Sequence, residues 1–455
     1  MTDKQALRDL DLAHCLHPST DLPAHHQKGP MIFAEGNGMW LKDIDGKEYL
    51  DCQAGLANCN LGHGNEEVAQ AAYDQMRQLQ FTTSGSGFAS KPLINLSAKL
   101  AGILSPHLTR ILVMSGGSEV NEAAIKLSRY LNRLEGRPEK HKIISRKLAY
   151  HGSTVGTVPT TDLSTFEQAS SPLPPGYLRI DAPDSYRCRF CSDQPKCNLE
   201  CARELERTIV QEGPETVAGF IGEPVMQNGA QAPAEGYWQT IRDICDRYQV
   251  FLIMDEVITG LGRTGKLFAF QHWGVWPDLL TFSKALGAGY YPVGVLATGE
   301  KTYQRLLNAA PDAGLWHFFT FSGTAVGSAV GLKTLEIIER LSIVENARIM
   351  GDRLLQGLNS LREFEFVGDV QGVGLLNCMK FVSSKQTREP APKQLCARIE
   401  QLTRDRGLLV RLNPARGMMW VNPPLIVEAA HVDRAVDTLR ECFSIIQGEM
   451  QARSS

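Results

Sequence analysis

Between about residue 70 and residue 320, the chain alternates between short apolar runs and amphipathic segments. Each apolar run is followed by polar or glycine residues, which is typical of buried parallel strands in an α/β domain. The pattern therefore predicts helices that alternate with strands at 111–114, 142–144, 217–221, 251–254 and 279–282.

The two ends of the chain have a different pattern. Residues 36–51 alternate apolar and polar positions across Asp45-Gly46, a dipeptide typical of β-hairpins. Near the C-terminus the pattern predicts a helix over 325–340, strands near 374–379 and 407–411, and a final helix from about residue 429. We expect these elements to form a small α+β domain that the N-terminal hairpin joins.

With 455 residues, the chain is too long for one ordinary hydrophobic core. We expect an N-terminal segment that contributes to the small domain (1–70), a large domain (71–324) and a C-terminal small domain (325–455). The net charge of -3 argues against a polyanion-binding surface. No stretch approaches 18 consecutive apolar residues, and the N-terminus lacks the apolar core of a secretory signal. We therefore expect a cytoplasmic protein with neither membrane nor nucleic-acid partners.

Two polar residues lie where buried strands end. Asp255 closes the apolar run at 250–254, and Lys284 is bracketed by Phe282 and Leu286. A desolvated lysine has a lowered pKa and becomes a usable nucleophile. This pair suits pyridoxal 5'-phosphate, because the amine holds the cofactor's aldehyde and the carboxylate keeps the ring nitrogen protonated. When each residue is considered alone, there is a simpler alternative: Asp255 is a helix cap, and Lys284 is a surface lysine.

A candidate phosphate site follows the strand predicted at 111–114. Residues 115–118 read Ser-Gly-Gly-Ser and precede one apolar helical face. Glycines and free N–H groups at a helix N-terminus suit a phosphate, although a serine N-cap with a glycine turn is the alternative. Tyr150 follows another predicted strand, and two interpretations are open for it. Its ring stacks on a flat heteroaromatic ligand, or it packs in the core. The helical face consists of Val120, Ala123, Ala124, Leu127 and Leu131.

The order of phosphate-binding helix, aromatic residue, aspartate and lysine resembles that of the fold-type-I pyridoxal phosphate enzymes. From about residue 30 to the C-terminus the chain is similar to the class III aminotransferases. The segments that carry this resemblance are 36–62, 115–127, 150–154, 222–225, 254–265, 277–289 and 320–323.

The resemblance implies an α/β fold of type I, with a large domain built on a mostly parallel seven-stranded sheet and a small α+β domain. It also implies that pyridoxal 5'-phosphate is the cofactor. Gly117 and Ser118 would hold its phosphate, and Tyr150 and Val257 would cover the two faces of its ring.

The resemblance further implies catalytic roles and a homodimer with its active site at the interface. Lys284 would bind the cofactor and shuttle the proton, and Asp255 would pair with the pyridine nitrogen. Thr320 would reach the phosphate of the neighbouring subunit. Glu223 would lie beside the substrate, and Arg411 would pair with a substrate carboxylate, phosphonate or phosphate. An exposed arginine at a strand end is the alternative for Arg411.

Three departures from the family pattern affect the substrate pocket. Phe318 replaces a glycine, Ala57 replaces a tryptophan, and residues 225–229 (Val-Met-Gln-Asn-Gly) replace smaller ones. The last departure puts Gln227 and Asn228 near the substrate. We expect a pocket that is more polar than that of an aryl-amine transaminase and differs from it in shape.

The leading hypothesis is an aminotransferase that moves an amino group from a small, acidic ω-amino substrate to a keto acid. The runner-up is an ammonia-lyase or phospholyase of the same family, acting on a small amino phosphonate or amino phosphate. A racemase is a further alternative. A cofactor-binding protein without catalysis is disfavoured by the presence of both Lys284 and Asp255.

Four of the eleven cysteines are clustered as C-x2-C-x5-C-x3-C, at Cys188, Cys191, Cys197 and Cys201. Two interpretations stay open. The four thiolates form a closed tetrahedral zinc site, or the segment is an inserted loop that leads into a helix. We expect the other seven cysteines to be reduced and packed as small apolar groups.

Overall fold

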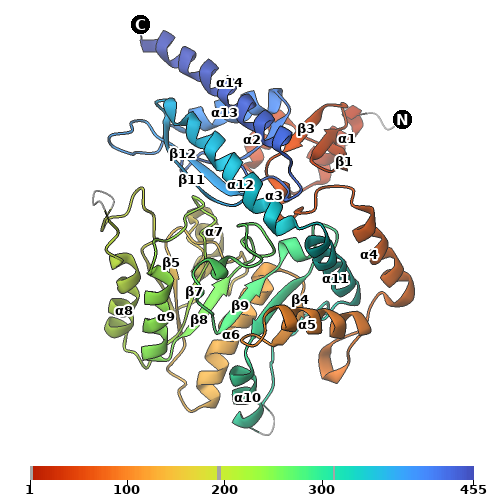
Figure 1. Cartoon of the computed structure of the whole chain (residues 1–455), viewed down its shortest axis with the longest axis vertical. Coiled ribbons are helices and arrows are strands. Elements are labelled where there is room, and N and C mark those ends of the chain that lie inside the picture. The colour runs from red at the N-terminus through yellow and green to blue at the C-terminus, as the bar shows by residue number, and fades with distance from the viewer. Residues whose placement is uncertain (1–3, 192–195, 311–312, 455) are drawn as a thin grey trace.

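The computed structural model describes residues 4–191, 196–310 and 313–454, and a seven-stranded sheet lies at its centre (Figure 1). All neighbouring strands are parallel except for the two pairs that involve β10. The predicted, mostly parallel sheet is therefore confirmed. Its spatial order is β4 (Arg110–Met114), β10 (Gly294–Thr298), β9 (Leu279–Phe282), β8 (Phe251–Asp255), β7 (Val217–Gly222), β5 (Lys142–Arg146) and β6 (Tyr177–Ile180).

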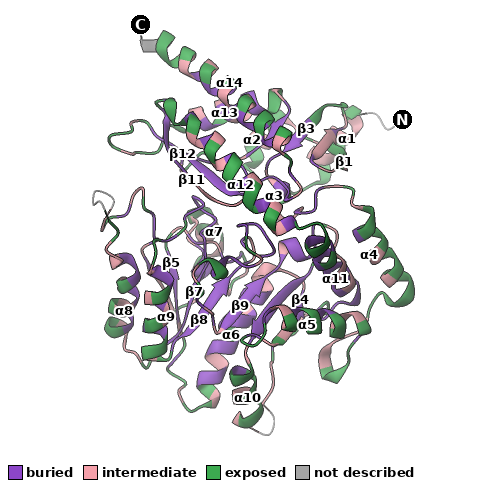
Figure 2. Ribbon diagram, in the orientation of Figure 1, coloured by how far each residue is buried: buried purple, intermediate pink, exposed green. Residues whose placement is uncertain are grey.

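Helices pack around this sheet, and Figure 2 shows in purple the residues that this packing buries. In α6 the face predicted from Val120 to Leu131 is buried, because its apolar residues recur at helical spacing. The helices of this part of the chain are α4 (Glu66–Leu79), α5 (Lys91–Ile103), α6 (Gly117–Leu134), α7 (Ser164–Ser170), α8 (Glu200–Glu212), α9 (Tyr237–Tyr248), α10 (Glu300–Ala309) and α11 (Ala325–Arg340).

The side chains of β8 point alternately to the two faces of the sheet. Leu252 and Met254 belong to an apolar core that includes residues of α8 and α9. Phe251 and Ile253 belong to a second core with the inner face of α6. Asp255 is next in this alternation, so the strand ends with a carboxylate on the α6 side.

Two smaller sheets lie above the central sheet in Figure 1. One has the order β1 (Phe33–Asn37), β2 (Trp40–Asp43), β3 (Glu48–Asp51) and β13 (Leu408–Leu409). The other has the order β11 (Val367–Val373), β12 (Leu376–Phe381), β15 (Met418–Trp420) and β14 (Arg411–Asn413). Helices α1 (Lys4–His14), α2 (Leu22–Lys28), α3 (Ala54–Ala57), α12 (Ile343–Ser360), α13 (Lys393–Asp405) and α14 (Ala429–Ser454) complete the chain.

The N-terminal hairpin is completed by a strand from near the C-terminus. Leu408 of β13 pairs with Leu50 of β3 in parallel. The predicted helix over 325–340 is observed as α11, and it packs against α4 and α5. The division of the chain into domains at residues 70 and 324 stays a prediction. In the part of the chain that the structure describes, no helix is long and apolar enough to cross a membrane.

Candidate active site

A cavity of about 230 Å³ opens where strands of the central sheet end. In open α/β sheets ligands bind beyond the carboxyl ends of the strands, because the following loops converge there. The lining residues come from the segments after β4, β5, β7, β8 and β9. The structure therefore brings together seven residues singled out by the sequence: Gly117, Ser118, Tyr150, Glu223, Asp255, Val257 and Lys284.

Asp255 is buried in this cavity and accepts three hydrogen bonds. The donors are Asn121 Nδ2 at 2.7 Å, His151 Nδ1 at 2.7 Å and the backbone N of Val257 at 2.9 Å. The Thr281 hydroxyl donates to Asn121 Oδ1 at 2.6 Å, which orients the amide so that its nitrogen faces Asp255. These donors compensate for the burial of a carboxylate. Asp255 is thus a fixed group in the cavity wall.

Sequence reasoning missed Asn121 and His151. Asn121 lies one helical turn after Ser118, and His151 follows Tyr150, so both were near residues already singled out. The Nδ1 of His151 donates to the Asp255 carboxylate, which leaves Nε2 directed away from Asp255. This Nε2 is buried and has no hydrogen-bond partner among the described residues. This nitrogen of His151 is therefore available for a hydrogen bond with a ligand or a water.

Lys284 begins the short helix η4 (Lys284–Leu286) at φ +35°, a backbone conformation that is costly for a residue with a side chain. Desolvation lowers the pKa of Lys284 to about 8. Asp255 and Glu223 oppose this shift, whereas Arg411 adds to it. An amine with this pKa is partly neutral near physiological pH and is a competent nucleophile.

Two glycines keep open a space at the N-terminus of α6. A Cβ on Gly117 would lie 2.9 Å from Val257 Cγ1, and a Cβ on Gly152 would lie 2.5 Å from Ser118 Oγ. The first-turn N–H groups of α6 have no partner within the helix, and the positive end of its dipole lies here. Glycines, N–H groups and the Ser118 hydroxyl together fit a phosphate group.

Arg411 and Gln227 line a narrow cavity that shares Ile258 with the first one. The guanidinium of Arg411 lies 5.2 Å from the centre of the Trp420 ring, and burial lowers the pKa of Arg411. No carboxylate of the described residues pairs with Arg411. The groups that raise its pKa, against the effect of burial, are Tyr150 and Cys378. A desolvated, unpaired guanidinium is suited to bind an anionic ligand.

Gln227 is held by its backbone rather than by its side chain. Its N donates to Glu223 Oε1 at 3.2 Å, and its O accepts from the Trp420 indole at 2.7 Å. Its buried side-chain oxygen has no partner within the described residues. Asn228 was expected near the substrate, but its amide donates to the Leu148 carbonyl at 2.6 Å and lines neither cavity.

Thr320 does not line either cavity within one chain. It is exposed, between Phe318, which is 57% exposed, and Phe321, which is 48% exposed. The bulky side chain that replaces a glycine in the family pattern therefore lies at the surface of the single chain.

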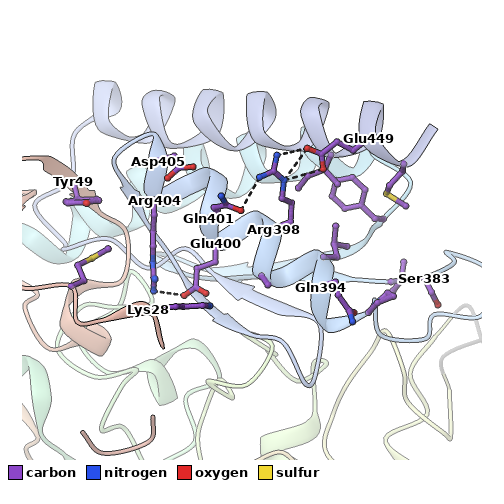
Figure 3. A pocket seen from close by; sticks show the side chains of 18 of the residues that line it. Lys28, Tyr49, Ser383, Gln394, Arg398, Glu400, Gln401, Arg404, Asp405 and Glu449 are labelled. Atoms are coloured by element: carbon purple, nitrogen blue, oxygen red, sulfur yellow. Dashed lines mark hydrogen bonds and ion pairs between the residues drawn. The ribbon is translucent and has the colours of Figure 1, made fainter. Parts of the chain in front are cut away.

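A larger cavity, of about 950 Å³, lies beside α13 and α14 (Figure 3). Both arginines that line it are paired with glutamates. Arg398 contacts Glu449 at 2.5 Å, and Arg404 contacts Glu400 at 2.6 Å. These pairs neutralise the charges that a ligand would need, so we place the candidate active site at the smaller cavity.

Three of the four clustered cysteines, Cys188, Cys191 and Cys197, lie in the segment between β6 and α8, and Cys201 lies in the first turn of α8. Cys188 and Cys201 are buried, and the Sγ atoms of Cys191 and Cys197 are 3.7 Å apart without a disulfide. Burial, together with hydrogen bonds to Cys188 and Cys197, raises the pKa of Cys191 to about 12. Both interpretations of this cluster, a zinc site and an inserted loop, stay predictions.

Comparisons with known proteins agree with this geometry. The family model described as aminotransferase class-III matches residues 22–443. The chain belongs to the class III aminotransferase family.

Relatives match it over nearly its whole length. The taurine--pyruvate aminotransferase of Bilophila wadsworthia is 34% identical, over 98% of each chain. A solved (S)-enantioselective omega-transaminase from Thermomicrobium roseum is 39% identical with a TM-score of 0.92, covering 98% of this chain and 99% of the other. The omega transaminase of Pseudomonas jessenii, solved in complex with PMP, is 33% identical with a TM-score of 0.91, over 96% and 97% of the two chains.

This aminotransferase therefore has the type I fold and depends on pyridoxal 5'-phosphate. It transfers an amino group to a keto acid. The residues of the cavity fit the cofactor, because a phosphate cradle, a reactive amine and a fixed carboxylate surround one space. The predicted family, fold class and cofactor are confirmed.

The lowered pKa of Lys284 predicts how cofactor loading depends on pH. The neutral amine becomes more abundant as pH rises through the folded-state pKa. The rate at which the apoenzyme takes up pyridoxal phosphate should therefore rise from pH 7, reach half its maximum at about pH 8 and level off about one pH unit higher. Stopped-flow absorbance measures this rate, and Nα-acetyl-lysine assayed in parallel corrects for titration of the cofactor. A rate that keeps rising toward the usual lysine pKa of 10.5 would contradict the assignment.

Proposed function

We propose that this aminotransferase acts on small ω-amino substrates that carry an acidic group. The observation that carries the proposal is Arg411, a largely buried cation stacked on Trp420, with no carboxylate partner among the described residues. A buried arginine in this state binds an anion strongly, because the ion pair forms away from water and is bidentate. The Bilophila relative, named for an amine with an acidic group, fits the same substrate class.

We further propose roles for the residues that surround the cofactor. Gly117 and Ser118 hold the phosphate, and Tyr150 and Val257 cover the two faces of the ring. Asp255, held by Asn121 and His151, pairs with the ring nitrogen. The cofactor, when bound, supplies an electron-withdrawing ring that stabilises negative charge on the substrate carbon.

Lys284 performs the proton transfers in this proposal. Its Nζ would hold the cofactor and, as a free amine, would accept the proton from the substrate carbon and later release it. A pKa of about 8 allows the same amine to accept and release a proton near neutral pH. Asp255 and Arg411 act on this pKa in opposite directions, so the charge of a bound substrate tunes it as well.

Glu223 and Gln227 complete the substrate side of the site in this proposal. Burial raises the pKa of Glu223, and Arg146 and His151 oppose that shift. The free amide oxygen of Gln227 is an acceptor beside Arg411. We infer that Gln227 orients the substrate's acidic end or its amine, whereas Glu223 sets the charge of the pocket.

We propose that the enzyme is a cytoplasmic homodimer with its active site at the interface. Exposed aromatic rings support this proposal, since large exposed apolar groups are typical of protein interfaces. Phe88 is 62% exposed, Phe318 is 57% exposed, and Phe81 contacts Phe321 with ring centres 5.6 Å apart. Thr320, beside these rings, would reach the cofactor phosphate of the neighbouring subunit.

A substrate panel tests the proposed reaction. We expect ω-amino sulfonates, carboxylates or phosphonates to be turned over only when a keto acid is present, with taurine and pyruvate as the first pair. Each amine is also assayed for ammonia release and racemisation without an acceptor. Lys284→Ala should lose all turnover, because no other amine of the cavity replaces it. Acceptor-independent ammonia release would favour the lyase alternative, and an active Lys284→Ala variant would refute the site.

Arg411→Ala should selectively lower kcat/KM for acidic substrates. Loss of a charge-assisted bidentate contact costs about 2–4 kcal/mol, so kcat/KM for acidic amines should fall roughly 30- to 1000-fold, and that for a neutral diamine much less. Arg411→Lys should recover only part of the loss, because an ammonium lacks the fork geometry. Arg404→Ala, at the surface, is the matched control. Equal losses for acidic and neutral amines would show that Arg411 is structural.

A further inference from the structure

The N-terminal helices α1 and α2 have little apolar packing to hold them. Neither helix contains a buried residue. Surface ion pairs connect α1 to the rest of the chain, where Arg8 and Lys4 contact Asp45, and such pairs contribute little stability. A segment without a core is commonly fixed by a cross-link, such as a disulfide or a metal ion.

A cluster of metal-binding side chains lies between the two helices. Asp11 Oδ1 is 2.9 Å and Oδ2 is 3.0 Å from His17 Nε2, and Oδ2 is also 3.0 Å from His25 Nε2. The ligand atoms of Asp11, Cys15 and His17 all lie within 4.8 Å of one another. The rings of His17 and His25 have centres 4.4 Å apart. One carboxylate, one thiol and one imidazole thus lie close together, and the His25 imidazole of α2 contacts the same carboxylate.

The backbone presets this convergence. Cys15 directly follows the last residue of α1, and its N donates to the Asp11 carbonyl at 2.8 Å, so the two residues lie one helical turn apart. His17 follows where the chain leaves the helix, and His25 comes from α2. The spacing Asp-x3-Cys-x-His-x7-His therefore joins both helices through four side chains.

The donor set matches a zinc ion in chemistry and in charge. Carboxylate oxygen, thiolate sulfur and imidazole nitrogen are the ligands that Zn²⁺ takes in tetrahedral sites, at about 2.0–2.3 Å. One carboxylate and one thiolate balance the two positive charges of the ion. Both imidazoles already direct Nε2 to the Asp11 carboxylate, so three ligands are close together and a shift of the His25 side chain toward Cys15 would supply the fourth.

We propose that Asp11, Cys15, His17 and His25 form a zinc site that links α1 to α2 and orders the N-terminal segment. The site lies apart from the cavity that holds Lys284, and the reaction does not pass through it. Removal of the metal should therefore loosen the N-terminus and leave the lysine-bound cofactor in place.

The test measures zinc in the full-length, cofactor-loaded enzyme after dialysis against a chelator and titration with Zn²⁺. We expect Cys15→Ser with His17→Ala to lose about one zinc per chain relative to the wild type. His26→Ala, an exposed histidine in α2 beside His25, is the matched control and should keep it. Circular dichroism and the cofactor absorbance confirm that each variant is folded and loaded.

Two further measurements make the outcome decisive. Zinc at ten times its Kd should slow tryptic cleavage at Arg8 and Lys28 by about tenfold in the wild type and not in the double variant, because bound metal disfavours opening. Cobalt should give a thiolate charge-transfer band that Cys15→Ser removes. Equal zinc content in wild type and double variant would overturn the proposal. Zinc lost only from Cys188→Ser with Cys191→Ser would also overturn it and assign the metal to the four-cysteine cluster.

Discussion

The active-site geometry depends on one buried carboxylate. Asp255 needs its three donors, because a carboxylate taken out of water without partners costs several kcal/mol. Those donors come from α6, from the segment after β5 and from the loop after β8 itself. The Thr281 hydroxyl on β9 holds Asn121 in turn. A shift of any one of these elements would remove a donor from a buried charge, so the fold is constrained to keep the strand ends together.

The surroundings of Lys284 shift its pKa in opposite directions. Desolvation favours its neutral form, whereas Asp255 and Glu223 favour the charged one, and the resulting pKa of about 8 lies between these tendencies. The residue also sits at a positive φ, which the short helix η4 and the β9 strand before it maintain. Strain of this kind is common at sites where a side chain must be held in one direction. A reactive amine therefore results from packing as much as from sequence.

The strands that position the site were predictable because each is a buried apolar run bounded by polar residues. The runs at 111–114, 142–144, 217–221, 251–254 and 279–282 correspond to observed strands, whereas β6 and β10 were not predicted. Tyr177–Ile180 contains an arginine, and Gly294–Thr298 begins with glycine, so neither run has a distinctive pattern.

The residues that line the candidate cavity were predictable for a similar reason, since each lies at or after the end of a strand. Polar partners distant in sequence were not. Asn121 and Asp255 are 134 residues apart, and only the fold shows that they are hydrogen-bonded. Asn228 neighbours Gln227, yet its amide is taken by a backbone carbonyl, which no local pattern reveals. Residues that complete a site across a subunit boundary, as proposed for Thr320, can be recognised only in the structure of the assembled dimer.

The central claim is that the Asp255 network keeps the pyridine nitrogen of the cofactor protonated. The most direct measurement is the ¹⁵N NMR shift of that nitrogen in enzyme loaded with labelled pyridoxal phosphate. The account predicts a protonated nitrogen in the wild type, an unprotonated one in Asp255→Ala, and an intermediate loss in Asn121→Ala. An unprotonated nitrogen in the wild type, or a signal unchanged in Asp255→Ala, would contradict it.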